Sequence, residues 1–90
     1  MIKMKTVIAN VINDLAKIPN LDELMPKEMA RATELVEQGT LKHLFIKDDH
    51  MGAVLVLANV NAEEAKKVME SFPMFPHFQE IIYTETEQSF

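Results

Sequence analysis

The side chains able to do chemistry in this chain of 90 residues are few. It has no cysteine, which excludes a thiol nucleophile, a disulfide framework and a thiolate metal site. Its three histidines, at positions 43, 50 and 77, lack metal-ligand spacing such as His-x₃-His. Its two glycines, at positions 39 and 52, are too few and too far apart for a phosphate-binding loop. The sequence therefore offers no thiol, metal-binding or phosphate-loop chemistry, and we expect neither a metal nor a cofactor.

The composition indicates one compact domain over residues 1–90. A hydrophobic fraction of 48% with 26% charged residues is typical of an ordered globular protein. The net charge is −5 and the basic residues are scattered, which argues against binding to a phosphate backbone. The apolar runs are far shorter than the roughly 20 residues of a membrane span, and a secretory leader fits poorly. We expect a cytoplasmic protein with neither nucleic acid nor membrane as partner.

The first half of the chain predicts a strand, a connection and a helix. Met4–Ile12 is rich in β-branched residues, which favour a strand. Leu15–Leu24 contains a Pro-Asn pair and is predicted to be a connection with at most one helical turn. Pro26–Gln38 is predicted to be a helix that starts at its proline and is capped by the following glycine. Its apolar face should comprise Met25, Met29, Ala32 and Val36, and its opposite, solvated face Lys27, Glu28, Arg31, Glu34 and Glu37.

The second half predicts a hairpin and a second helix. Leu41–Lys47 and Ala53–Val60 are two strands joined by a short polar turn, so they should pair antiparallel. Asn61 is predicted to cap the following helix, with Glu64 in the reciprocal capping position. The buried stripe of this helix should comprise Ala65, Val68, Met69 and Phe72, and a proline at position 73 should end it.

A last strand at Gln79–Glu85, followed by a polar tail Thr86–Phe90, completes the order β-α-β-β-α-β. This order is typical of a ferredoxin-like α+β sandwich, a four-stranded antiparallel sheet with two helices on one face. A sheet exposed on its other face should alternate apolar and polar residues, but Ala53–Ala58 is apolar throughout. We therefore expect a second copy of the chain to cover that face, in a homodimer or larger even-numbered assembly.

Two segments resemble the muconolactone isomerase family. Gln38–Phe45 is similar to a family stretch in which a glycine and a basic-His-Leu-aromatic sequence enter the second strand. Phe72–His77, which reads Phe-Pro-Met-Phe-Pro-His, is similar to the family's more specific Leu-Pro-Leu-Phe-Pro-Tyr segment. The resemblance covers roughly residues 23–86. It implies a dimeric α+β barrel that can assemble further into rings, with a pocket between the sheet and the helices.

The resemblance also implies site residues, because a muconolactone-type isomerisation moves a proton across an allylic lactone in a desolvated pocket. His43 is predicted to alternate with Leu41 and Phe45 on one strand face and to transfer the proton. Glu28 matches a family glutamate and is predicted to be the orienting partner or base at the rim of the same cavity. The ordinary alternatives are a packed, hydrogen-bonded histidine and a solvated glutamate. The residues expected to contact substrate are Phe45, Phe75, His77 and Tyr83.

The leading functional hypothesis is a cofactor-independent isomerase that moves a proton on a small lactone or related aromatic-degradation metabolite. The alternative is a module of the same barrel type that binds a small molecule, or serves assembly, without catalysis. A cofactor-independent monooxygenase is a weaker third hypothesis, since only Asn10 and His77 suit it and the chain has no tryptophan. Fold alone does not decide among them.

Overall fold

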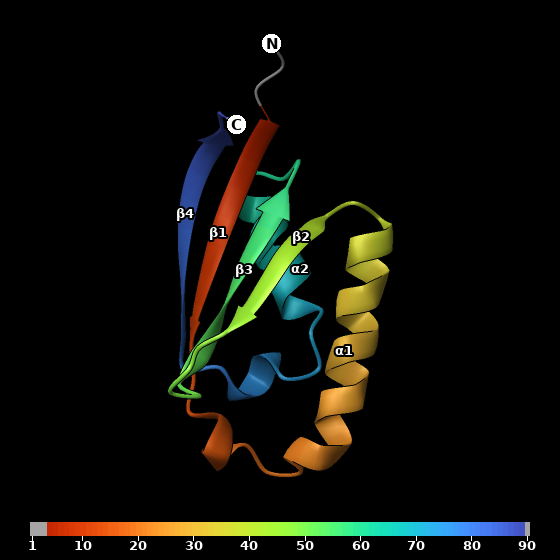
Figure 1. Ribbon diagram of the computed structural model, residues 1–90, viewed down its shortest axis with the longest axis vertical. Coiled ribbons are helices and arrows are strands. Elements are labelled where there is room, and N and C mark those ends of the chain that lie inside the picture. The colour runs from red at the N-terminus through yellow and green to blue at the C-terminus, as the bar shows by residue number, and fades with distance from the viewer. Residues whose placement is uncertain (1–3, 90) are drawn as a thin grey trace.

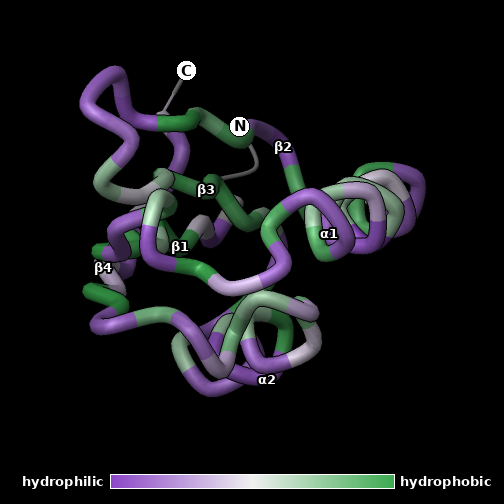
Figure 2. The backbone as a smooth tube through the Cα atoms, turned by 90° about the horizontal axis from the view of Figure 1, so that it is seen from below, coloured by the Kyte–Doolittle hydropathy of each residue, from purple (hydrophilic) through white to green (hydrophobic). Residues whose placement is uncertain are grey.

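The computed structural model describes residues 4–89 as a four-stranded antiparallel sheet with two main helices on one side (Figures 1 and 2). In chain order the elements are β1 (Met4–Ile12), the short 3₁₀ helix η1 (Leu15–Lys17), α1 (Leu21–Glu37), β2 (Leu41–Ile46), β3 (Gly52–Ala58), α2 (Ala62–Glu70), the short 3₁₀ helix η2 (Phe75–His77) and β4 (Glu80–Gln88). The strand order is β2-β3-β1-β4, with β1 and β3 in the centre. The predicted ferredoxin-like βαββαβ fold is confirmed.

The core lies between the sheet and the helices. Val7, Ala9 and Val11 of β1 face this side, and Leu55 and Leu57 of β3 are their neighbours in the sheet. α1 lies beside β2, and α2 lies against β1 and β4, so the two helices cover different parts of the sheet (Figure 2). None of the helices within residues 4–89 has the length and apolar character needed to cross a membrane.

α1 begins earlier than predicted, at Leu21 instead of Pro26. Asn20 adopts a left-handed conformation with φ of 58°, and its carbonyl oxygen accepts the N–H groups of Glu23 and Leu24, both at 3.0 Å. Pro26 therefore lies in the second turn, where its missing N–H costs one helical hydrogen bond but does not end the helix. Our boundary was wrong because we placed the proline in the first turn, where it is preferred.

The buried side of α1 also differs from the prediction. Ala32 and Leu35 are buried, whereas Val36 has an exposed fraction of 56% and points away from the core. Glu28 lies four residues before Ala32 and seven before Leu35, and this spacing places it on the buried stripe. The prediction that Glu28 belongs to the solvated face is therefore wrong.

The hairpin and the last strand contain two further differences. A register irregularity separates Leu41 from His43 in β2, so Leu41 faces the helices while His43 and Phe45 face the opposite side. Our expectation that Leu41 and His43 share a strand face is wrong for this reason. β4 continues to Gln88, because the start of β1 supplies backbone partners in the register Met4 with Gln88, so most of the predicted tail is strand.

The second helix follows the prediction closely. The Asn61 side chain accepts the N–H of Glu64 at 2.8 Å, and the Glu64 carboxylate accepts the N–H of Asn61 at 3.1 Å, which completes the predicted capping box. Ala65, Met69 and Phe72 are buried as expected. The helix ends at Glu70, ahead of the proline.

The face of the sheet away from the helices, here called the open face, carries mainly apolar and uncharged polar side chains. It comprises His43 and Phe45 of β2, Val54 and Val56 of β3, Thr6, Ile8 and Asn10 of β1, and Ile82, Thr84 and Thr86 of β4. Phe45 and Ile82 have exposed fractions of 57% and 44%. The predicted lack of apolar-polar alternation is confirmed for β3, whereas β1 places Thr6 and Asn10 on this face.

Candidate active site between the sheet and the helices

A narrow cavity of about 60 Å³ lies between α1, the sheet and the segment that follows α2. Its wall is almost entirely apolar, and its hydrophobic lining includes Val11, Leu15, Met25, Met29, Leu44, Ile46, Ala53, Leu55, Met69, Phe72, Met74 and Phe78. Two polar side chains, those of Glu28 and Asn13, interrupt this wall. An apolar enclosure with a few polar groups is the usual form of a small-molecule site.

Glu28 is the ionisable group of the cavity. Its Oε1 accepts the backbone N–H of Met74 at 2.9 Å, which ties α1 to the segment after α2. Burial raises the pKa of the Glu28 carboxyl above its ordinary value, and the bond from Met74 partly opposes this rise. A carboxylate in an apolar wall is poorly solvated, so it is a stronger base than a glutamate in water.

Asn13 is the second polar group and has an exposed fraction of only 3%. Its amide nitrogen Nδ2 is buried and has no hydrogen-bond partner. The backbone N–H of Asn13 donates to the carbonyl of Met51 at 3.0 Å, and this bond fixes the residue beside the start of β3. The cavity therefore contains one base and one unused donor.

Access to the cavity is between α1 and the β2 edge of the sheet. Met29 and Ile46, from these two elements, both line the cavity and have exposed fractions of 50% and 49%. The cavity is smaller than a five-membered lactone, so a ligand of that size must displace side chains. Met25, Met29 and Met74 are suited to this, because the unbranched methionine side chain repacks at low cost.

His43 and Phe45 do not line this cavity. They lie on the open face, where their rings stack with centroids 5.9 Å apart, and His43 borders a hollow of about 350 Å³ together with Thr6 and Lys42. The sheet separates this hollow from Glu28. The structure thus does not bring the two predicted proton-transfer residues together within one chain, and the catalytic role of His43 stays a prediction.

The other predicted contact residues lie elsewhere. Phe75 and Tyr83 line an open groove of about 440 Å³ beside α2 and β4. Lys66 Nζ lies 6.0 Å from the centre of the Tyr83 ring, and burial, followed by the charge of Glu70, raises the pKa of the tyrosine. His77 is half-buried in η2 and lines neither this groove nor the cavity.

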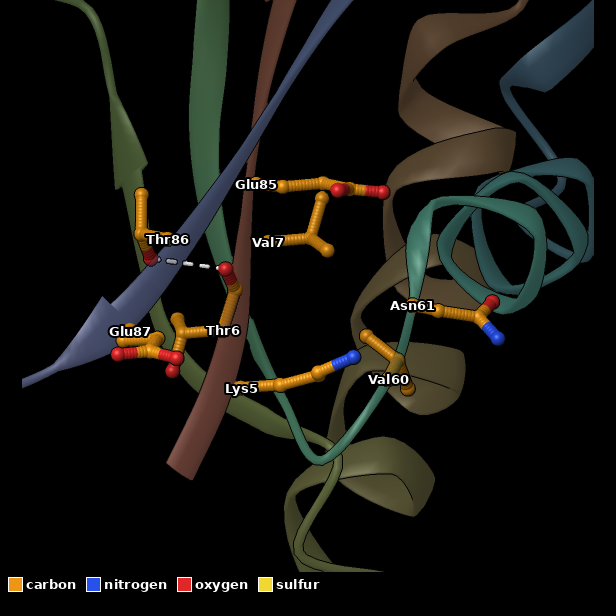
Figure 3. A pocket seen from close by; sticks show the side chains of 8 residues that line it. All are labelled: Lys5, Thr6, Val7, Val60, Asn61, Glu85, Thr86 and Glu87. Atoms are coloured by element: carbon orange, nitrogen blue, oxygen red, sulfur yellow. Dashed lines mark hydrogen bonds between the residues drawn. The ribbon is translucent and has the colours of Figure 1, made fainter. Parts of the chain in front are cut away.

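A further hollow of about 250 Å³ lies where β1 and β4 meet the start of α2 (Figure 3). Lys5 and Glu85 extend from the sheet toward Val60 and Asn61, and Thr86 Oγ1 donates to the carbonyl of Thr6 at 2.8 Å. This hollow has a mixed polar and apolar wall and is open to solvent, so it lacks the desolvated wall of the cavity that holds Glu28. Within residues 4–89, no three potential metal-ligating side chains gather as a metal site would require.

Two parts of the cavity were missed by the sequence analysis. Asn13 appeared only as the end of the first strand, and its burial depends on the later hairpin that covers it. The segment Phe72–Phe78 was predicted to contact substrate through Phe75 and His77, but the residues of this segment that line the cavity are Phe72, Met74 and Phe78, and it also supplies the backbone donor to Glu28. Its two prolines were the available signal, because they give the loop a fixed shape.

Comparison with known proteins adds the family. No match to the chain was found among curated proteins. The sequence profile of muconolactone delta-isomerase matches residues 3–84, which include Glu28, Asn13 and the whole segment that closes the cavity behind Glu28. This match extends over most of the chain and includes β1, which the resemblance noted above does not cover well. The chain therefore belongs to the muconolactone delta-isomerase family.

Proposed function

We propose that this protein is a cofactor-independent isomerase that shifts a proton within a small unsaturated lactone, with Glu28 as the base. The observation that supports this most directly is the bond from the Met74 N–H to the Glu28 carboxylate inside an apolar cavity. Met74 belongs to the family-like segment Phe72–His77, so the most specific family feature of the sequence holds Glu28, the ionisable side chain that lines the cavity among residues 4–89.

The arrangement suits a proton shift without net change in composition. Glu28 Oε2 has no hydrogen-bond partner within residues 4–89, whereas Oε1 is occupied by Met74. In the proposed reaction, Oε2 removes a proton from a ring carbon, and the electron pair of that C–H bond delocalises toward the lactone carbonyl. The same proton then returns from Glu28 to another ring carbon, and the double bond moves. The apolar wall keeps water from exchanging with the intermediate.

A second candidate function is binding without turnover. The small size of the cavity favours it, because about 60 Å³ holds a lactone only after side chains move. The two candidates differ in one observable, since only the isomerase exchanges carbon-bound hydrogen of the ligand with solvent. A measurement of turnover, and not of affinity, therefore distinguishes the two candidate functions.

We also propose that the functional unit is a homodimer formed through the open face. Phe45 and Ile82 lie at the two edges of this face and are about half exposed, with Ile8, Val54 and Val56 between them. Leaving such a face in water is unfavourable, whereas a second copy covers it with the same side chains about a two-fold axis. The cavity that holds Glu28 lies on the other side of the sheet and is left accessible by this packing.

The experiment uses purified protein with muconolactone and uncharged butenolides, followed by proton NMR in deuterated buffer. Exchange and isomerisation are expected for the wild type. Glu28→Gln should lower kcat by roughly 10²–10⁴-fold, because it removes the base. Glu37→Gln is the matched control on the same helix, since Glu37 is exposed and does not line the cavity. A wild type inactive on every lactone, or a fully active Glu28→Gln, would contradict the proposal.

A further inference from the structure

The unused donor of Asn13 requires an explanation of its own. Asn13 is 3% exposed, and Nδ2 lies in the interior without a hydrogen-bond partner. An unpaired buried donor destabilises a folded protein, and a leucine of similar size would avoid this cost. A group of this kind beside an apolar cavity is expected where a ligand supplies the missing acceptor.

Hydrogen bonds fix the backbone at Asn13 and at the two residues that follow it. Its own N–H is bonded to Met51, and the next residue, Asp14, accepts the N–H of Ala16 at 3.1 Å as the cap of η1. Leu15 N–H also donates to the carbonyl of His50 at 3.1 Å. The backbone of Asn13 is therefore fixed before any ligand binds, and with 3% exposure its side chain is enclosed by neighbouring atoms, which favours stabilisation of a developing negative charge.

The charge of the cavity limits which chemical group of a ligand can be this acceptor. Glu28 is the only ionisable side chain that lines it among residues 4–89, and no lysine, arginine or histidine of that range takes part. A ligand carboxylate placed here would be repelled by Glu28 and would lose its hydration without a counter-ion. A neutral carbonyl group avoids both costs and accepts a hydrogen bond from a neutral amide.

On the basis of the isomerase function proposed above, we propose that the cavity takes an uncharged unsaturated lactone, and that Asn13 Nδ2 donates to the carbonyl oxygen of its ring. Glu28 breaks a C–H bond next to that carbonyl, and the electron pair moves onto the carbonyl oxygen to give a dienolate. Asn13 stabilises this oxygen while Glu28 holds the proton. Glu28 then protonates the γ-carbon, the pair returns to the ring, and an α,β-unsaturated lactone is formed.

The experiment compares two β,γ-unsaturated probes, α-angelica lactone as the neutral butenolide and the β,γ-unsaturated isomer of muconolactone as the same ring with a carboxylate. Variants Asn13→Leu and Glu28→Gln are assayed beside Gln79→Leu, which removes an exposed amide outside the cavity. Wild type should use the neutral lactone with a kcat/KM at least tenfold higher than that for the lactone with a carboxylate. Asn13→Leu should lower kcat on the neutral lactone by roughly 10²–10³-fold while its urea midpoint is unchanged or higher.

The outcomes separate this inference from the proposed function. Turnover that depends on Glu28 but is unchanged in Asn13→Leu, or that prefers the lactone with a carboxylate, overturns the inference and leaves the isomerase proposal standing. If neither lactone is turned over, the proposed function fails. Titration of ¹⁵N-labelled wild type then decides the ligand class without any variant, because the Asn13 side-chain amide resonances should shift with α-angelica lactone and not with the lactone that carries a carboxylate. Unshifted resonances overturn the inference.

Discussion

Glu28 owes its chemical character to its place on α1. One turn later on the same stripe comes buried Ala32, so the carboxylate lies toward the core and not toward water. The enclosure raises the pKa of its carboxyl, and Met74 fixes one of its two oxygens without removing the other from use. Glutamate is usually a surface residue, but Glu28 is a candidate base because it is buried and oriented by Met74.

The pH dependence of catalysis follows from this burial. Because Glu28 must be ionised to accept a proton, kcat/KM should fall toward acid pH with an apparent pKa above the 4.5 of an ordinary glutamate. The measurement is a pH profile of kcat/KM on the best lactone substrate. An acid limb centred at or below 4.5 would show that the active base is not desolvated.

The same group should affect stability with a defined sign. Since its pKa is raised in the folded state, the folded protein binds more protons than the unfolded chain between the two pKa values, and stability falls as pH rises through that interval. Glu28→Gln cannot ionise and should lack this fall. Urea unfolding of both proteins at several pH values measures the difference, and parallel profiles would contradict the assignment.

At the scale of elements, the sequence was sufficient to predict a helix or strand boundary where that boundary depends on residues close together in the chain. The bounds of β1 and the capping box of α2 were predictable because β-branched runs and the Asn61–Glu64 pair act locally. The bulge in β2 was not predictable, since it depends on how β3 pairs with it. That one irregularity moved His43 to the face opposite Glu28, so the candidate site could be predicted only in part.

Gly52, at the start of β3, lies so close to β1 that the packing of these two strands depends on the missing side chain. Its φ is +140°, and an added Cβ would overlap the carbonyl oxygen of Val11 in β1. Gly52→Ala should therefore destabilise the protein by about 2–4 kcal/mol, measured by urea unfolding. Gly39→Ala is the matched control, because Gly39 has φ of +78° but open space around it, and should cost only about 1–2 kcal/mol. Equal losses would show that backbone strain alone, without the clash, explains Gly52.

At the scale of the whole molecule, the two faces of the sheet differ in what covers their side chains. The helical face encloses the core and the cavity, whereas the open face exposes apolar side chains that the single chain does not cover. A chain of this size buries a limited share of its surface, so a shared core adds stability that one copy lacks. The proposed assembly and the proposed catalysis therefore concern opposite sides of one sheet.

Ile82 is the position that tests this assignment most directly. It lies in β4 opposite Asn10 of β1 on the open face and has an exposed fraction of 44%. Ile82→Glu adds a charge that a face-to-face dimer would have to bury, so the mass in solution should fall from a multiple of 10.3 kDa to the single chain. Val36→Glu is the control, because Val36 is 56% exposed on α1, away from the open face, and should leave the mass unchanged.

Sedimentation at micromolar concentration measures both variants, and a wild type that sediments as a 10.3 kDa monomer would contradict the dimer. A dimer that survives Ile82→Glu would place the interface elsewhere, and the α1–β2 edge with Met29 and Ile46 would then be the other apolar surface to examine.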